Sequence, residues 1–113
     1  MDQNLNDIAV INNEAAHRFE ATVNGLRALL TYRRFPDKII FDHTEVPPPL
    51  EGKGLAAKVT RAALDFARSN NLRVVPLCPY AASYIRRHPE VQDLVSAADL
   101  QRILSRSNKA TGS

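Results

Sequence analysis

The sequence predicts an α/β fold with a mixed β-sheet, and two observations support this prediction. In the first half of the chain, residues 18–23 and 26–34 have strand character, and Asn24-Gly25 between them is a strong hairpin signal, so these strands should be antiparallel. In the second half, β-branched segments at 38–46 and 72–77 enclose a helical pattern. That order is typical of a βαβ unit with two parallel strands.

The antiparallel part of the sheet is predicted to begin with a short strand at residues 8–11, ended by Asn12-Asn13. Residues 18–23 alternate polar and apolar side chains, as a half-buried strand does, and residues 26–34 form the returning strand. The turn Phe35-Pro36-Asp37 then leads into the strand at 38–46. Residues 1–7 are polar and are expected to be flexible.

A helix is predicted after Gly54 because apolar residues recur there at helical spacing. Its buried face should comprise Leu55, Val59, Ala62, Ala63, Phe66 and Ala67. The opposite side carries Lys58, Arg61, Asp65 and Arg68. Arg61 and Asp65 can pair at i,i+4, and this side is expected to be mostly solvated. Asn70-Asn71 can supply a left-handed residue that ends the helix.

Two further helices are predicted after the strand at 72–77. Residues 80–88 form a short helix that stops at Pro89, and Ser96 with Asp99 resembles a capping box that opens a last helix through Leu104. The tail at 107–113 is expected to be disordered. The 113 residues therefore form one domain, at 8–106, with a single core.

Composition limits the possible classes of function. Hydrophobic residues make up 44% and charged residues 24%, as in ordinary soluble proteins, and no apolar run approaches the ~20 residues of a membrane span. The polar start is unlike a secretory signal, so a cytoplasmic location is expected. The single cysteine excludes an internal disulfide, and the histidines lack metal-ligand spacing, so no metal site is expected.

A net charge of +3 suits an anionic small molecule as well as nucleic acid. Nucleic acid is the disfavoured partner because the aromatic residues are few and are not interleaved with the Lys and Arg residues.

The segment Gly52-Lys53-Gly54 is the first candidate for a binding site. Glycines allow positive φ and a close approach of the backbone N–H groups to a ligand, and the helix start that follows leaves more N–H groups unpaired. Phosphate is the expected anion at such a site. The alternative is a plain tight turn before a helix.

Cys78 is the candidate nucleophile. It ends the second parallel strand at the edge where open α/β sheets bind ligands, and Pro79 is suited to be the first residue of the next helix, whose positive end favours a thiolate. Tyr80 and Tyr84, one turn apart, could each protonate a leaving thiolate. The alternatives are a buried apolar cysteine and two packing tyrosines. His43 and His88 could act as bases, although the sequence places no carboxylate to orient either.

These residues resemble the GNAT N-acetyltransferases, which carry a phosphate-binding loop of the form Gln/Arg-x-x-Gly-x-Gly/Ala between a strand and a helix. Pro49-Leu50-Glu51-Gly52-Lys53-Gly54 fits both glycines but has Pro49 at the Gln/Arg position. The chain is most similar to very small, single-domain members of the YjdJ type, over about residues 8 to 95. The similar segments are Arg18-Phe19-Glu20, His43-Thr44-Glu45-Val46-Pro47, Gly52-Lys53-Gly54-Leu55-Ala56, and Cys78-Pro79-Tyr80 followed by Arg87-His88-Pro89-Glu90.

The resemblance implies that the chain binds acetyl-CoA or coenzyme A and transfers an acetyl group to an amine of unknown identity, which can be a protein or peptide amine. It places the pyrophosphate on the N–H groups of Gly52, Lys53, Gly54, Leu55, Ala56 and Ala57. The pantetheine arm would follow Thr44, Glu45 and Val46, with Arg87 or Lys53 near the phosphates. It also implies a catalytic role for Cys78, with Tyr84 or Tyr80 as general acid and Glu45 as a possible base. The alternative within this family is a coenzyme A binding module without turnover.

Overall fold

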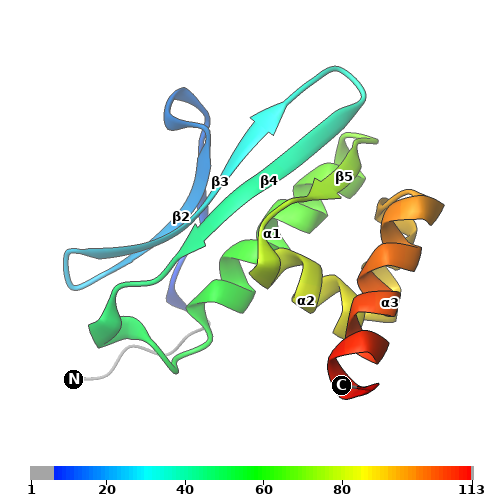
Figure 1. The fold of residues 1–113 in the computed structure, drawn as a ribbon. Helices are drawn as coiled ribbons and strands as arrows, with labels where there is room; N and C mark the ends of the chain where they lie inside the picture. Colours follow the sequence, from blue (N-terminus) through cyan, green and yellow to red (C-terminus); the bar gives the residue numbers. More distant parts are fainter. Residues whose placement is uncertain (1–6, 113) are drawn as a thin grey trace.

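The computed structural model describes the backbone of residues 7–112 and the side chains of residues 7–105. Five strands form one sheet in the order β1-β2-β3-β4-β5 (Figure 1). They are β1 (Ile11–Asn13), β2 (Arg18–Val23), β3 (Leu26–Arg34), β4 (Lys38–Glu45) and β5 (Arg73–Pro76). The first four are antiparallel neighbours, and β5 is parallel to β4. The predicted mixed sheet, with its antiparallel half and its parallel pair, is confirmed.

Helices connect and follow the parallel strands. The α-helices are α1 (Leu55–Ser69), α2 (Pro79–Arg87) and α3 (Ala97–Gly112). Short 3-10 helices occur at η2 (Glu14–Ala16), η3 (Pro48–Leu50) and η4 (Pro89–Leu94). Helix α1 links β4 to β5, and α2 follows β5 directly, so the end of β4 and the starts of α1 and α2 gather in one region of the molecule (Figure 1).

The β2–β3 hairpin has the predicted turn. Asn24 and Gly25 both have positive φ, 51° and 80°, which is the backbone that a two-residue type I′ turn requires. Its two strands alternate, with Phe19, Leu30 and Tyr32 among the residues buried on one face. On the other face of β2 and β3 no described side chain is buried. The sheet is therefore covered on one face, and its second face is open over these strands.

The predicted first strand is wrong in its position. Residues 8–10 are not a strand, and β1 instead occupies Ile11–Asn13, where Ile11 lies opposite Glu20 and Asn13 opposite Arg18. Ile8 packs into the core instead of pairing. Its apolar side chain contributes to burial, which the sequence pattern does not distinguish from strand pairing.

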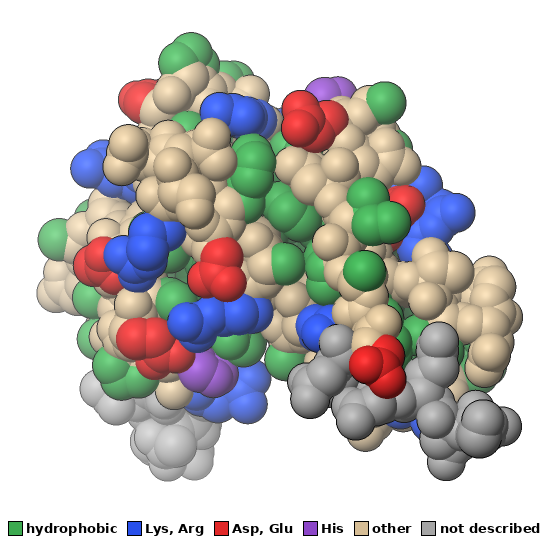
Figure 2. Space-filling model, turned by 180° about the vertical axis from the view of Figure 1, so that it is seen from behind, with side chains coloured by type: hydrophobic (Ala, Val, Ile, Leu, Met, Phe, Trp, Pro, Cys, Tyr) green, Lys and Arg blue, Asp and Glu red, His purple; other side chains and the backbone are tan. Residues whose placement is uncertain are grey.

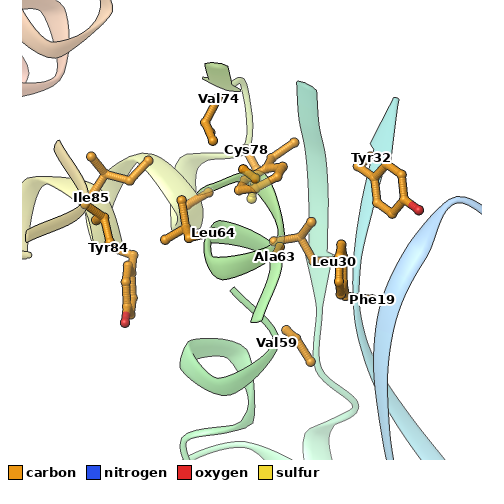
Figure 3. Packing of buried hydrophobic residues seen from close by; sticks show 14 of the residues in the cluster. Phe19, Leu30, Tyr32, Val59, Ala63, Leu64, Val74, Cys78, Tyr84 and Ile85 are labelled. Carbon is orange, nitrogen blue, oxygen red and sulfur yellow. The ribbon is translucent and has the colours of Figure 1, made fainter. Parts of the chain in front are cut away.

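Helix α1 packs across the sheet through the predicted residues Leu55, Val59, Ala63 and Ala67, some of which are seen in Figure 3. Two further α1 residues, Thr60 and Leu64, are also fully buried. The reason is that α1 contacts η4 and α2 as well as the sheet. The buried stripe is therefore wider than a helix lying on a sheet alone would need.

The charged side of α1 is less solvated than predicted. The expected Arg61–Asp65 pair is present at 3.4 Å, but Arg61 also reaches the Glu90 carboxylate of η4 at 2.8 Å. Arg68 binds Asp93 of η4 through two nitrogens, each at 2.9 Å. These ion pairs join η4 to α1, so this charged stripe is in part an interface between two elements.

The helix ends follow the capping signals. Asn71 has φ 55°, and the N–H of Leu72 donates to the Ala67 carbonyl at 2.8 Å, which is the Schellman arrangement that Asn70-Asn71 predicted. At the start of α3 the Asp99 N–H donates to Ser96 Oγ at 3.1 Å. Helix α3 extends past its predicted end at Leu104 to Gly112. Disorder from Ser107 onward stays a prediction, and residues 1–6 of the predicted flexible start lie outside the described residues.

Candidate functional site

The two parallel strands separate after four residue pairs. Pairing runs from Lys38–Arg73 to Phe41–Pro76, and then the N–H groups of Leu77 and Cys78 both donate to the Phe41 carbonyl, at 3.1 and 3.0 Å. From there the chain turns into α2, while β4 continues to Glu45 beside β3 alone. One edge of β4 at residues 42–45 therefore faces a gap instead of a strand.

A β-bulge decides which side chains of β4 face which way at this gap. Thr31 lies opposite His43 and Tyr32 opposite Phe41, so Asp42 is the extra residue. Past the bulge, Thr44 lies opposite Leu30, which belongs to the buried face. Thr44 therefore lies on the helix-covered face of the sheet, and its neighbours along the strand lie on the open face.

Cys78 is where the sequence places it, as the residue before α2, with Pro79 in the first turn of that helix. Its side chain is only 2% exposed and lies within the core (Figure 3). The Sγ atom lies 3.0 Å from Thr44 Oγ1. This contact spans the gap between the free edge of β4 and the start of α2. The sequence analysis named Cys78 as a candidate nucleophile and Thr44 as a cofactor-binding residue, but it did not predict a contact between them.

Tyr80 and Tyr84 lie in different surroundings. Burial raises the pKa of the Tyr80 hydroxyl, the charge and hydrogen bond of Arg87 oppose this effect, and Tyr84 and Cys78 add smaller raising effects. The Tyr80 phenol therefore stays protonated at neutral pH, as a proton donor must. The Tyr84 hydroxyl is directed away from Cys78 (Figure 3).

Tyr84 belongs to a second group on the α1 side of α2. Its ring stacks on His88, with centroids 3.8 Å apart, and His88 Nδ1 donates to the Tyr84 carbonyl at 2.7 Å. The Tyr84 hydroxyl and the Glu90 carboxylate raise the pKa of the Arg61 guanidinium. Tyr84 and His88 thus have packing and hydrogen-bonding roles between α1, α2 and η4, apart from the region of Cys78.

The glycine-rich loop has the predicted backbone geometry. Gly52 and Gly54 both have φ 81°, and Gly54 precedes α1 without any side-chain cap. The first helical hydrogen bond runs from the Lys58 N–H to the Gly54 carbonyl, at 3.1 Å. The N–H groups at residues 55–57 therefore have no acceptor within the helix. A Cβ added at Gly52 would meet nothing within 4 Å, so the space over the loop is open.

Cationic side chains surround this helix start. An open cleft of about 490 Å³ runs from Gly54 along α1, where Lys58 and Arg61 line it. Lys53 in the loop is exposed. Arg87 lies farther along α2, where its Nε donates to the Ser83 carbonyl at 3.3 Å. On the face shown in Figure 2, Lys and Arg side chains are interspersed with Asp and Glu, in contrast to a continuous basic surface.

Glu45, which the resemblance offers as a possible base, lies beside His43. Glu45 Oε1 is 3.4 Å from His43 Nε2, and both side chains are 61% exposed. The signal was present in the sequence, since residues two apart in a strand point to the same face. The prediction that no carboxylate orients His43 is therefore wrong.

No cluster of three or more His, Cys, Asp or Glu residues is placed to hold a metal ion within the described part of the chain. Among the described helices, none has the length and apolar character needed to cross a membrane.

A mixed sheet whose parallel strands separate beside a glycine-rich helix start defines an α/β protein with a loop of the geometry that suits an anion and an unpaired strand edge next to it. Residues 18–94 match the family model of GCN5-related N-acetyl-transferases. Protein NATD1 of Mus musculus and of Homo sapiens are both 33% identical to the chain over 90 residues, which cover 77% of this chain and 82% and 80% of those proteins. The chain belongs to the GCN5-related N-acetyltransferase family.

A solved structure supports the same assignment. The NMR structure of a GCN5-like protein from Staphylococcus aureus matches with a TM-score of 0.62 and 30% identity, covering 81% of this chain and 91% of that one. The resemblance stated from the four sequence segments is thereby confirmed at the level of family and fold.

Proposed function

We propose that the protein binds acetyl-CoA and transfers its acetyl group to an amine. The observation that carries this proposal is the free edge of β4 at residues 42–45, beside the uncapped start of α1. An extended amide chain can pair with an unpartnered strand edge through backbone hydrogen bonds. A pyrophosphate can accept hydrogen bonds from the N–H groups of the glycine loop and of the first turn of α1.

The charges nearby suit the same ligand. Coenzyme A carries phosphates at one end, and Lys53, Lys58 and Arg61 lie in or near the loop and along the cleft that begins at Gly54. Pro49 stands where relatives have Gln or Arg, so the backbone and these cations supply the phosphate contacts in this chain. We assign Arg87 to the thioester end of acetyl-CoA and not to its phosphates, because Arg87 lies beside Tyr80, the proposed proton donor to the thioester sulfur.

The test of cofactor binding is calorimetric titration with acetyl-CoA and coenzyme A. We expect both to bind, and we expect Lys53→Ala to weaken coenzyme A more than dephospho-coenzyme A if Lys53 meets the 3′-phosphate. No heat and no thermal stabilisation at millimolar ligand would refute the proposed function. Equal losses for the two ligands would remove only the role of Lys53.

Transfer can proceed through Cys78 or directly. In the covalent route, Cys78 Sγ attacks the thioester carbonyl, the bond to the sulfur of coenzyme A breaks, that thiolate takes a proton from Tyr80, and the proton that Cys78 loses restores the Tyr80 hydroxyl. The acetyl group then passes from Cys78 to the amine. The contact with Thr44 supports this route because the thiol lies at the gap that the thioester would enter. The 2% exposure of Cys78 requires that the thioester reach it from within this gap.

Peptide mapping by mass spectrometry tests the covalent route. After incubation with acetyl-CoA, one hydroxylamine-sensitive acetyl group should be found on Cys78. Cys78→Ala should bind coenzyme A within about 1 kcal/mol of the parent, because little packing volume is lost, yet it should fail in labelling and transfer. Unchanged transfer by this variant would show that the amine attacks acetyl-CoA directly. Binding without transfer to any amine would instead identify a coenzyme A binding module.

A further inference from the structure

The pair formed by His43 and Glu45 is placed on the opposite side of the sheet from Cys78. Past the bulge, His43 lies opposite Thr31 and Glu45 opposite Leu29, and the partners of both belong to the open face. Thr44, between them, lies on the helix-covered face and contacts Cys78. The same short segment of β4 therefore presents different chemistry to the two faces of the sheet.

The edge of β4 beside this segment has no strand partner. Since β5 ends at Pro76, nothing pairs with this edge at His43 or Glu45 within the described chain. A thioester carbonyl bound along this edge would lie at the level of the sheet, next to His43 on the open face and Thr44 on the helix-covered face. A second substrate that enters from the open face meets His43 before it reaches the thioester.

The contact with Glu45 defines the chemistry of the imidazole. A carboxylate accepts only, so His43 Nε2–H donates to Glu45 Oε1, and in the neutral imidazole this leaves the lone pair on Nδ1. The His43 carbonyl accepts a hydrogen bond from Thr31 Oγ1 at 3.4 Å, which ties the backbone of this residue to β3. A base oriented by a carboxylate is the arrangement that general-base catalysis uses.

The other charges near the pair on this face are bound to one another. Arg18 of β2, which lies across Thr31 from His43, pairs with Glu20 at 2.5 Å. Arg33 on β3 is engaged by Asp42 through hydrogen bonds of 2.9 to 3.2 Å, so these two charges offset one another. Leu77, which follows β5, is an exposed apolar residue and carries no charge. Glu45 is therefore the carboxylate that governs His43.

We propose that His43, held by Glu45, is the base that receives the acceptor amine on the open face of the sheet. This inference rests on the proposed acetyl transfer and adds to it the side from which the acceptor enters. His43 Nδ1 takes one proton from the ammonium group, and the freed amine attacks the thioester carbonyl carbon. The C–S bond breaks, its electron pair stays on sulfur, and the sulfur takes the second proton released by the nitrogen. The balance is the same whether the thioester is acetyl-CoA or acetyl-Cys78.

The position of the base also restricts the acceptor. The open face around His43 carries charged residues of β3 and β4, among them Arg33, Asp42 and Glu45. An amine on a slender exposed chain, such as a polyamine or the lysine of an unfolded peptide, can extend between these side chains to the edge of β4.

The test compares His43→Gln and Glu45→Gln with a matched control, His17→Asn. His17 is an exposed histidine that precedes β2 and is separated from β4 by β3, and its φ of 56° is a backbone that Asn tolerates. Loss of the thioester absorbance reports turnover with acetyl-CoA and either spermidine or a lysine peptide, between pH 6 and 10. Calorimetry reports acetyl-CoA binding, and thermal melts report folding.

We expect His43→Gln to reduce transfer at pH 7 by about 10² to 10⁴-fold, with acetyl-CoA affinity within twofold of the parent. The deficit should shrink as the pH rises, because the amine then loses its proton without help. Glu45→Gln should reduce the rate of transfer by a smaller factor than His43→Gln does. His17→Asn should transfer acetyl groups at the parent's rate. A pH–rate profile of His43→Gln that parallels the parent's would overturn the proposal, and so would a parent that binds acetyl-CoA but acetylates neither amine. A parent that does not bind acetyl-CoA would overturn the proposed function itself.

Discussion

Replacing Gly52 by alanine tests the anion-binding loop with a control inside the same chain. Gly52 and Gly25 have nearly equal φ, 81° and 80°, and at both positions an added Cβ meets nothing within 4 Å. Alanine at either position strains the folded backbone, which destabilises the protein by roughly 1 to 2 kcal/mol. The same change lowers the entropy of the unfolded chain, which offsets about 0.4 to 1 kcal/mol of that loss. Both variants should therefore lose a similar stability, about 1 kcal/mol, or roughly 4 °C in Tm.

The two variants should differ in binding. Only Gly52 belongs to the loop before α1, where a methyl group would keep a phosphate away from the backbone N–H groups. The loss of one hydrogen bond to a charged group is worth about 1.5 to 3 kcal/mol, which is a factor of about 10 to 150 in Kd. Gly25 lies in the β2–β3 turn, and its variant should bind as the parent does.

Calorimetric titration with coenzyme A measures the Kd of the parent and of both variants, at a temperature well below the melting transitions of the variants. Parent-like affinity of Gly52→Ala would refute the phosphate site at this loop. Equal weakening in both variants would show that lost stability, and not a lost contact, causes the effect.

Three further predictions concern stability and proton donation. Thr60 is fully buried and its Oγ1 lacks a partner among the described residues, so Thr60→Val should raise Tm by a few degrees, corresponding to up to about 1 kcal/mol; a lower Tm in thermal melts would contradict this. The hydrogen bond from Arg18 lowers the pKa of Glu20 below its ordinary 4.5, so the stability it contributes is present above that value and is lost as the pH falls through the lowered pKa. Arg18→Gln should therefore flatten the loss of stability on acidification in urea titrations from pH 6 to 3, and an unchanged slope would contradict the assignment. Tyr80→Phe should reduce acetyl transfer more than Tyr84→Phe does, because the Tyr80 phenol lies near Cys78; the reverse order of kcat values would assign the donor to Tyr84.

Local signals in the sequence are sufficient where the structure depends on a few adjacent residues. Asn24-Gly25 sets its own turn, Gly54 allows the left-handed residue before α1, and Asn71 ends that helix. In each case the backbone conformation required is one that few residue types adopt. These features predicted the strand order and placed the loop beside the carboxyl end of β4.

Contacts between distant elements were predicted less well. The charged side of α1 meets Glu90 and Asp93 of η4, and the second buried side of α1 carries Thr60. Neither follows from helical periodicity, because periodicity identifies an apolar face but not which polar groups a neighbouring element will cover. The sequence likewise left Tyr80 and Tyr84 as equal candidates for the general acid, and which of them acts stays a prediction.

The bulge at Asp42 is the feature that the sequence could not supply and on which the site depends. Strict alternation from the buried Phe41 would place His43 and Glu45 on the helix-covered face and Thr44 on the open face. The extra residue reverses this assignment, so that Thr44 meets Cys78 and the His43–Glu45 pair faces the open side. A variant with Asp42 deleted has Phe41, His43 and Thr44 consecutive, opposite Tyr32, Thr31 and Leu30, so regular alternation keeps Thr44 on the helix-covered face and preserves its contact with Cys78. Alkylation of Cys78 by iodoacetamide should therefore proceed at the parent's rate in this variant. A faster rate in the folded deletion variant would show that the bulge itself restricts access to the thiol.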